Sequence, residues 1–429
     1  MHLILAVPVL GLMGLVAVRC LMAWGVPSPL PAAFFAGKAP TPPGAYTPSR
    51  RELWKVFGLA MGIRLALLGV VALCLAMTAN QGLSRPSIEG SFQLWDARHY
   101  IALIEKGYGG YQEDGKHIFL VFFPLYVWVT RLVRLVVPST IGAGVLVSVL
   151  SYGWGCCWVY RLAGLVFGRR IAWDTVLFLS VFPFSLFFGA VMTEGLFLLT
   201  TSAACYFALR RRWLAYGIWG VLAAMTRMTG LLVIVPAFIE LGRAVRLLQR
   251  PARRPIGRWL LPALGKLPLL LLPLLGTGVY LLLNWRIDGD PLAFVVHQRH
   301  WHQGGMPVPQ VLAYLWHYLR MYFRQPIGWS VWLPELVLFV VCFGVLALAC
   351  RHRAVPASLL GYGLLYLLAN YSLSWLLSGG RYLSCGVPLF MLEAYLVKDK
   401  PVLREYLLVA QAMLLGAYLF AYINHAPVM

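Results

Sequence analysis

The chain has 429 residues, of which 60% are hydrophobic and only 12% are charged. An ordinary soluble chain carries about 25% charged residues, and a soluble domain of this size cannot cover so much apolar surface with so few polar groups. The composition therefore excludes a soluble globular enzyme, a disordered chain and a disulfide scaffold. Because the apolar residues form long runs and do not alternate with polar ones, we expect an all-α, polytopic helical membrane protein.

The net charge of +21 comes from 36 Lys and Arg residues against 15 Asp and Glu residues. The basic residues form short clusters between apolar runs, which is the positive-inside pattern of membrane topology, so no nucleic-acid partner is expected. The eight cysteines lie in or beside apolar runs and predict neither a metal site nor a disulfide. The basic clusters, all predicted to be cytoplasmic, are Arg50/Arg51/Lys55, Arg210/Arg211/Arg212, the arginines between 243 and 258, Arg351/Arg353 and Lys398/Lys400/Arg404.

The first apolar run, residues 3–24, lacks a basic n-region and a small-residue cleavage site, so we expect a retained helix and not a signal peptide. Residues 25–49 contain seven prolines and predict an extended linker. Further apolar segments, which together predict about 10 to 13 helices of the length a bilayer requires, run over 56–79, 118–137, 141–165, 171–190, 194–209, 213–240, 262–283, 331–350, 354–377, 382–397 and 405–424.

The basic clusters place the two long polar loops, 80–117 and 284–330, on the extracytoplasmic side. Between 118 and 210 four apolar segments must carry the chain from outside to inside, so one segment has to be re-entrant or two have to merge. The run 213–240 is basic at both ends, which predicts a short hairpin or a helix broken near Thr226 and Arg227.

Acidic residues are scarce, yet five of the fifteen lie in the 80–117 loop. Within it, residues 94–108 predict a short amphipathic helix at the membrane interface, ended by Gly107. Asp96 stands at its start. The carboxylate there is either an N-cap, which spacing alone favours, or a general base near a lipid head group. The aromatic residues from Phe119 to Tyr126 are typical of a membrane belt, with Pro124 breaking or starting a helix.

Two ionisable residues, Glu194 and Arg227, lie inside apolar runs, where each would cost about 2.5 to 3.5 kcal/mol at the bilayer centre. Such residues mark either a structural ion pair or a functional site. Arg381 is predicted at the outer end of a helix, where the positive-inside rule does not explain a cation but an anionic head group such as a phosphate would. The 284–330 loop holds four of the nine histidines, but their spacing matches no standard zinc site and we expect no metal there.

Several of these segments resemble one known family in order and spacing. They resemble motifs of GPI mannosyltransferase II (PIG-V-like) proteins, which belong to the GT-C glycosyltransferases, and the family's Trp-Asp, Gly-Tyr and Phe-Phe-Pro stand here as Trp95-Asp96, Gly107-Tyr108 and Phe122-Phe123-Pro124. The later motifs are similar to Thr193-Glu194-Gly195, Thr226-Arg227 and Arg381-Tyr382. The chain departs from the family at Gly195, where a serine is usual, and at Val121, where an alanine is usual.

The resemblance implies a polyprenyl-phosphate sugar donor, with mannose as the expected sugar, and inverting transfer on the extracytoplasmic face. It makes Asp96 the general base and places Arg227 and Arg381 on the leaving phosphate. It also makes 56–429 a GT-C-like domain preceded, in 1–55, by an extra helix and Pro-rich linker. No cofactor is implied, although a divalent metal stays open. The other residues expected at the substrate are Trp95, His99, Tyr100, Tyr108, Phe123, Glu194 and Tyr382.

Two rival functions stay open from the sequence. A transporter or flippase for an anionic lipid-linked sugar would use the same intramembrane Glu194 and Arg227, but it predicts inverted repeats, which are not evident. A non-catalytic subunit of another glycosyltransferase is the second rival. The expected partners are the donor, a lipid-linked or glycan acceptor and membrane lipids, and the composition favours a bacterial plasma membrane.

Overall fold

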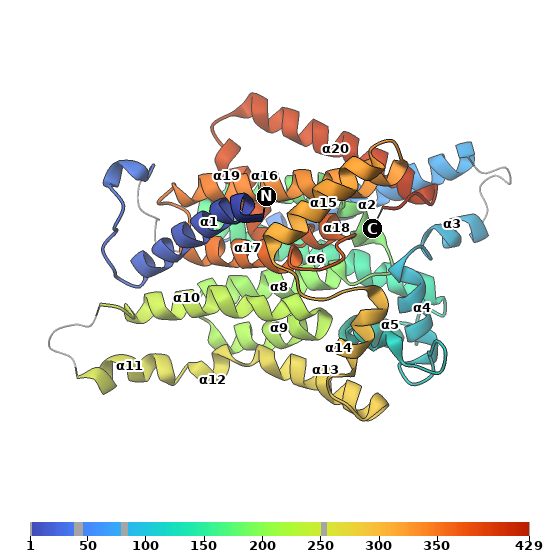
Figure 1. Cartoon of the computed structure of the whole chain (residues 1–429), viewed down its shortest axis with the longest axis horizontal. Helices are drawn as coiled ribbons and strands as arrows, with labels where there is room; N and C mark the ends of the chain where they lie inside the picture. Colours follow the sequence, from blue (N-terminus) through green and yellow to red (C-terminus); the bar gives the residue numbers. More distant parts are fainter. Residues whose placement is uncertain (1, 38–45, 79–84, 250–254, 429) are drawn as a thin grey trace.

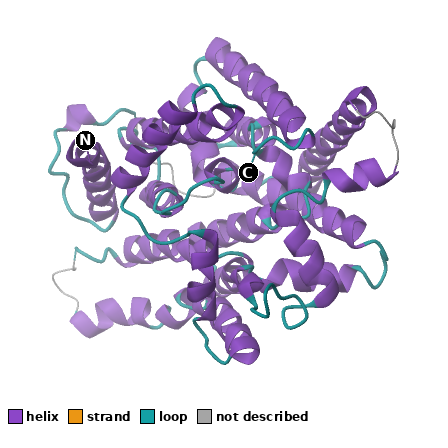
Figure 2. Cartoon of the chain, turned by 45° about the vertical axis from the view of Figure 1, so that its right-hand side comes forward, coloured by secondary structure: helices purple, strands orange, loops and turns teal. Residues whose placement is uncertain are grey.

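The structure is a computed structural model that describes residues 2–37, 46–78, 85–249 and 255–428. Its described residues form helices and loops without a strand, so the predicted all-α fold is confirmed (Figure 2). The first ten helices are α1 (His2–Ala23), α2 (Arg50–Thr78), α3 (Arg85–Ser91), α4 (Asp96–Lys106), α5 (Pro124–Val133), α6 (Thr140–Phe167), α7 (Arg169–Val181), α8 (Glu194–Leu209), α9 (Trp213–Thr226) and α10 (Ile234–Val245). The remaining helices are α11 (Ile256–Leu264), α12 (Leu267–Leu270), α13 (Pro273–Asp288), α14 (Ala293–His297), α15 (Val308–Tyr322), α16 (Leu333–Cys350), α17 (Ala357–Asn370), α18 (Gly379–Leu383), α19 (Val387–Val397) and α20 (Pro401–Ile423).

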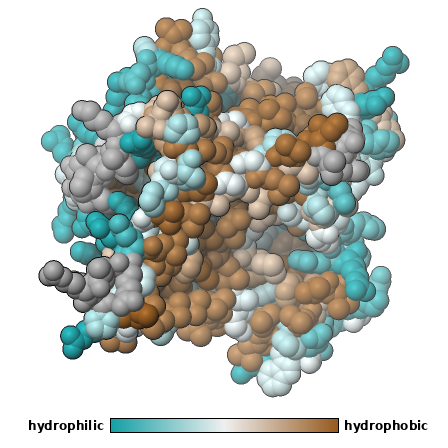
Figure 3. All heavy atoms as spheres, turned by 60° about the vertical axis from the view of Figure 1, so that its left-hand side comes forward, coloured by the Kyte–Doolittle hydropathy of each residue, from teal (hydrophilic) through white to brown (hydrophobic). Residues whose placement is uncertain are grey.

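Seven helical segments of the described chain are long and apolar enough to cross a membrane, and α8, α9, α17 and α19 are shorter apolar helices. In the described chain these apolar helices together number eleven, within the 10 to 13 helices predicted, but only seven have the length that a bilayer requires. The long helices run roughly along one direction, with α3, α4 and α5 gathered at one end of the bundle (Figure 1). Brown, hydrophobic side chains cover the middle of the face drawn in Figure 3, and hydrophilic ones gather toward its two sides, as expected for helices that meet lipid along their middle.

The apolar segment 118–137 does not span a membrane. It forms a short 3-10 turn, η2 (Ile118–Val121), and then α5, whose 10 residues rise only about 15 Å. Pro124 is the first residue of α5, where the N–H that proline lacks has no partner in the helix anyway. This short helix is therefore not among the described segments that are long and apolar enough to cross a membrane.

The run 213–240 is broken where the sequence predicts. Helix α9 ends at Thr226, Arg227 adopts an extended conformation with φ −157° and ψ 152°, and the 3-10 segment η4 (Met228–Val233) leads into α10. The break leaves the backbone at Arg227 outside regular helix. Its guanidinium can therefore reach sideways toward α8 and away from its own helix axis.

Helices α6, α8 and α9 pack side by side in the bundle. A close approach lies at Gly195 near the start of α8, where an added Cβ would overlap the carbonyl oxygen of Ser148 on α6. A serine, usual at this position in the PIG-V-like family, would force the two helices apart. The glycine thus fixes the distance between α6 and the helix that carries Glu194.

Helix α1 packs against α15, α16 and α17. Near its end, the buried Arg19 donates hydrogen bonds to the carbonyl oxygens of Cys350 at 2.6 Å, His352 at 2.9 Å and Val355 at 2.5 Å. These are free carbonyls at and after the C-terminus of α16, which a cation satisfies well. In the predicted linker, Ala36 pairs with the backbone of Arg351 and Arg353, and residues 38–45 lie outside the described chain.

Candidate active site

The predicted amphipathic helix is present as α4, which begins at Asp96 and ends before Gly107, whose φ of 77° suits glycine. Ala97, Tyr100 and Ile104 of the predicted apolar stripe are buried, whereas Ile101 is only half-buried. The residue before the helix, Trp95, has a φ of 55°, which is uncommon for a bulky side chain and is typical of functional sites. This backbone turn aims Asp96 into the bundle.

Asp96 does not act as an N-cap. The residue before α4 makes no side-chain capping hydrogen bond. The Asp96 carboxylate instead forms an ion pair with the Arg381 guanidinium, with 2.7 Å between Asp96 Oδ2 and Arg381 Nη2. The Asp96 side chain remains 31% exposed. No hydrogen-bond partner for its other oxygen occurs among the described residues, so that oxygen stays accessible from the cavity described below.

Glu194, the first residue of α8, joins the two arginines. Its Oε1 lies 3.1 Å from Nη1 of Arg227 and 3.4 Å from Nε of Arg381. The Glu194 side chain is only 2% exposed, against 7% for Arg381 and 16% for Arg227. The predicted ion pair between Glu194 and Arg227 therefore exists. It is part of a row of four charged side chains, Asp96, Arg381, Glu194 and Arg227, whose charges alternate in sign.

Aromatic rings support the two guanidiniums. The guanidinium carbon of Arg227 lies 4.7 Å from the ring centre of Tyr382, and that of Arg381 lies 5.3 Å from the same ring. A cation over an aromatic face is attracted by the ring quadrupole. The Tyr382 ring thus contacts both guanidiniums and keeps them close enough for a single anion to bind both.

Arg381 owes its position to a pair of glycines. The Glu335 carboxylate, 3% exposed, accepts a hydrogen bond of 2.6 Å from the Gly379 N–H, and the side chain of Phe184 packs where a Cβ of Gly380 would lie. A Cβ at Gly379 would overlap the Glu335 carboxylate. Two close contacts therefore fix the short helix α18, and with it the Arg381 side chain.

Gly379→Ala is expected to lower the thermal stability of the chain, because the added methyl group must displace a buried carboxylate from its N–H partner. An unsatisfied buried group of this kind costs about 1 to 3 kcal/mol. The melting temperature of the purified variant measures the effect. The matched control is Gly344→Ala on α16, the helix that carries Glu335, since an added Cβ at Gly344 meets no atom within 4 Å. Equal melting temperatures for the two variants would contradict the argument.

These side chains open into a cavity of about 530 Å³. Asp96, Arg227 and Arg381 form its charged part. Val121, Phe123, Met228, Leu231 and Leu232 give it an apolar part, and Met228 is 44% exposed at the surface. The remaining lining residues are Tyr100, Phe122, Thr226, Thr229, Gln298, Trp301, Gln303, Ala369, Asn370, Leu373 and Tyr382.

The electrostatics keep Asp96 ionised. Burial of its carboxyl group opposes ionisation, but the guanidinium of Arg381, with a smaller contribution from Arg227, outweighs it and holds the pKa of Asp96 below its usual value. The neighbouring His99 is neutral, because burial lowers its pKa to about 4 against the opposing charge of Asp96. An ionised carboxylate beside two cations can bind a hydroxyl group or, once Arg381 has another partner, take a proton.

The structure brings together some of the predicted site residues and separates others. Asp96, Tyr100, Phe123, Arg227, Arg381 and Tyr382 line the cavity, and Glu194 lies directly behind the arginines. His99 instead contacts Tyr111, with 3.0 Å between Nδ1 and the hydroxyl oxygen, and the Tyr108 hydroxyl donates to the Phe122 carbonyl at 2.9 Å. These two residues and Trp95 therefore shape the loop beneath the cavity and do not form its wall.

Three polar residues of the wall, Gln298, Gln303 and Asn370, were not predicted. Neutral amides carry no sequence signal of their own, and only the aromatic, His-rich character of 284–330 marked the region of Gln298 and Gln303. No group of three or more His, Cys, Asp or Glu residues that could hold a metal ion occurs in the described part of the chain.

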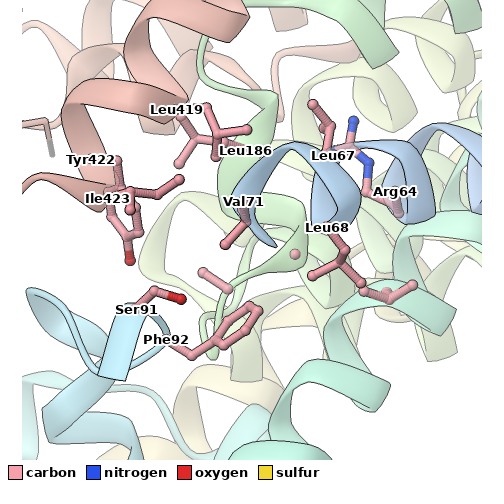
Figure 4. A pocket seen from close by; sticks show the side chains of 13 residues that line it. Arg64, Leu67, Leu68, Val71, Ser91, Phe92, Leu186, Leu419, Tyr422 and Ile423 are labelled. Carbon is pink, nitrogen blue, oxygen red and sulfur yellow. The ribbon is translucent and has the colours of Figure 1, made fainter. Parts of the chain in front are cut away.

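A smaller cavity, of about 50 Å³, lies between α2, α3, α20 and the turn around Leu186 (Figure 4). Its walls are mostly aliphatic. The buried Arg64 at its edge donates to the carbonyl oxygens of Ser180, at 2.9 Å, and Ser185, so its charge is used to cap the end of α7. The described residues that line this cavity include no carboxylate, so it offers less chemistry than the larger one.

Comparisons with known proteins give one family match and several similar solved structures. Residues 123–284 match the model of a family described as dolichyl-phosphate-mannose-protein mannosyltransferase. No curated protein sequence matches the chain. Among solved structures, ArnT from Cupriavidus metallidurans bound to undecaprenyl phosphate is similar with a TM-score of 0.50 and 18% identity, over 85% of this chain and 64% of that one. The Archaeoglobus fulgidus oligosaccharyltransferase is similar with a TM-score of 0.43 and 14% identity, over 85% of this chain and 53% of that one.

The chain thus spans less than two thirds of the length of these solved proteins. At such low identity the likeness to ArnT concerns the fold alone, and it defines the class: an all-helical protein with several helices long and apolar enough to cross a membrane. The family model that matches carries the name of a mannosyltransferase other than the PIG-V-like one.

Proposed function

We propose that the chain is a membrane glycosyltransferase that moves a sugar, with mannose the sugar proposed, from a polyprenyl-phosphate donor to a lipid-linked or glycan acceptor. In this proposal the configuration at C1 is inverted, Asp96 is the general base, and the reaction takes place on the extracytoplasmic face of a bacterial plasma membrane. The observation that carries the proposal is the accessible, ionised Asp96 in one cavity with two arginines and an apolar wall.

The chemistry follows from that arrangement. The acceptor hydroxyl oxygen attacks C1 of the donor sugar while Asp96 takes the hydroxyl proton. The bond between C1 and the phosphate oxygen breaks, and its electron pair leaves with the polyprenyl phosphate. Arg227 and Arg381 meet the charge that develops on this leaving group, which is the role preorganised cations fill best. The products are the glycosylated acceptor, the lipid phosphate and a protonated Asp96.

Arg381 has two partners in this scheme. Without donor it pairs with Asp96, which lowers the basicity of the carboxylate. A donor phosphate that binds Arg381 competes for the same guanidinium, so Asp96 becomes a stronger base once the donor is in place.

The nature of the donor is supported by several observations. The apolar side chains around Phe123 and Leu231 suit a polyprenyl tail. The matching family is named for dolichyl-phosphate-mannose, and the similar ArnT structure holds undecaprenyl phosphate, which is also a polyprenyl phosphate. The motif resemblance to PIG-V-like proteins favours mannose and the outer face.

The direct test supplies labelled polyprenyl-phosphate-mannose to membranes that contain the chain and to matched membranes that lack it. We expect label to move into an acceptor, and polyprenyl phosphate to be released, only where the chain is present. Purified chain in sealed vesicles provides the second arm. Movement of the intact labelled lipid across the bilayer without bond formation would overturn the proposal in favour of a flippase, and activity that requires another protein would favour a partner subunit.

The pH dependence of transfer should reflect the two shifted groups. Because the pKa of Asp96 lies below its usual value and that of His99 is about 4, neither group changes charge between about pH 5 and pH 8. The stability that Asp96 contributes is present throughout this range and is lost only as the pH falls through its lowered folded pKa. We therefore expect a flat profile of kcat/KM over these values, because kcat/KM reports the groups of the donor-free chain. A rate that falls through about pH 6.5, the usual histidine pKa, in wild type but not in His99→Gln would contradict this.

A further inference from the structure

The cavity of about 530 Å³ has a charged side and a neutral side. Asp96, Arg227 and Arg381 are the charged residues among its described lining. The segment 298–303, which includes the turn η5 (Gln298–Trp301), contributes two amides and an indole. A ligand in this cavity therefore meets an anion-binding region on one side and uncharged polar groups on the other.

The segment 298–303 sorts its side chains by charge. Gln298, Trp301 and Gln303 are half-buried and line the cavity, whereas Arg299 and His302 are exposed. The arginine of the segment thus lies outside the cavity, and the two amides and the indole lie inside it. The side chains of 298–303 that line the cavity therefore offer no charged group to a bound ligand.

Trp301 is fixed and has an unused hydrogen-bond donor. Its ring centre lies 5.4 Å from that of His99, nearly perpendicular to it, and 6.2 Å from that of Phe122. The indole Nε1 is buried without a hydrogen-bond partner among the described residues. A buried N–H without a partner costs about 1 to 3 kcal/mol, so an oxygen of a ligand in the cavity would be a favourable partner.

The backbone after the segment is held firmly. Gly304 N–H donates to Ser374 Oγ at 2.8 Å, Ser374 Oγ donates to the His302 carbonyl at 2.9 Å, and Met306 N–H donates to the Ser372 carbonyl at 2.9 Å. These bonds tie the segment to the chain that follows α17. The amides at 298 and 303 are therefore presented from a braced loop.

We propose that Gln298, Trp301 and Gln303 form the subsite for the donor's sugar, and that this sugar is an uncharged pyranose. The inference rests on the proposed function and names the part of the substrate that the arginines do not bind. An amide both donates and accepts hydrogen bonds, as a ring hydroxyl does, and an indole offers an apolar face together with its N–H. A cavity of this volume lies within the usual range for small-molecule sites, about 300 to 1,000 Å³.

The test compares two lipids on the full chain in detergent: a short-chain polyprenyl phosphate and the mannosyl ester of the same lipid. In the double variant Gln298→Ala/Gln303→Ala we expect the affinity for the mannosyl lipid to fall about tenfold, the effect of two lost neutral hydrogen bonds. The affinity for the sugar-free lipid should stay within about twofold, because the arginines are untouched. Trp301→Phe, which keeps a ring but removes the N–H, should act in the same direction.

The matched control is Arg299→Ala/His302→Ala, which changes two exposed side chains of the same segment. It should leave both affinities unchanged. An unaltered ratio of the two affinities in the glutamine variant, or an equal loss for both lipids, would overturn the subsite while leaving the proposed function standing. Failure of the wild-type chain to bind either lipid would overturn the proposed function and the subsite together.

Discussion

Asp96→Asn is expected to reduce the rate of sugar transfer by about 10² to 10⁴. Asparagine has the same shape and can still accept a hydrogen bond from Arg381, but it cannot take the proton of the acceptor hydroxyl. The measurement is transfer from labelled polyprenyl-phosphate-mannose by chain purified to the same level as wild type. Binding of the donor should persist, because the two arginines that we assign to the phosphate remain.

The matched control is Glu105→Gln on the same helix, α4. Glu105 accepts a hydrogen bond of 2.7 Å from Thr140 Oγ1 and does not line the cavity. The Glu105→Gln substitution changes the charge of α4 by the same amount as Asp96→Asn. The rate of sugar transfer should stay near that of wild type. Near-normal turnover by Asp96→Asn in a folded, membrane-inserted chain would remove the general base from the proposal.

Glu194→Ala is expected to destabilise the chain by about 3 to 5 kcal/mol, the cost of removing one partner from a buried ion pair. Its carboxylate lies within 3.4 Å of both guanidiniums and is almost fully buried. Without it, no described carboxylate pairs with Arg227, which is left facing Arg381. The melting temperature should therefore fall strongly, whereas Glu194→Gln, which keeps a hydrogen-bond acceptor, should lose less.

The same variant offers a test of where the phosphate binds. Polyprenyl phosphate supplies an anion beside Arg227 and Arg381, so it should raise the melting temperature of Glu194→Ala by more than that of wild type. A ligand stabilises a fold in proportion to its affinity and concentration. An equal rise in both proteins would argue against phosphate binding at these arginines.

The sequence predicted most of the helices because each span needs a long apolar run. It also predicted the break at Arg227, since that run is basic at both ends. The sequence overestimated the length of helix in segment 118–137. Its aromatic residues pack against protein, and only the 3-10 turn η2 and the short helix α5 form there. Apolar content cannot separate a residue that faces lipid from one that faces the protein core.

Within the candidate site, charge rarity was the useful signal. Asp96, Glu194, Arg227 and Arg381 stood out because an ionisable residue near the membrane needs a partner or a function. The sequence did not predict which of these charged residues pair with one another. Spacing favoured an N-cap for Asp96 and suggested Glu194 only as the partner of Arg227, whereas Arg381 contacts both carboxylates. His99 and Tyr108 belong to a sequence motif but serve the loop beneath the site.

The sequence by itself determined that this is a helical protein with membrane-spanning segments, and which rare charges have to be accounted for. These properties depend on composition and on local runs, and every residue carries them wherever it lies. Only the tertiary structure decided that four charges, from residue 96 to residue 381, form one alternating chain, and that Gln298 and Gln303 face them across a cavity. Contacts between such distant positions depend on helix packing and loop paths, which no local pattern specifies.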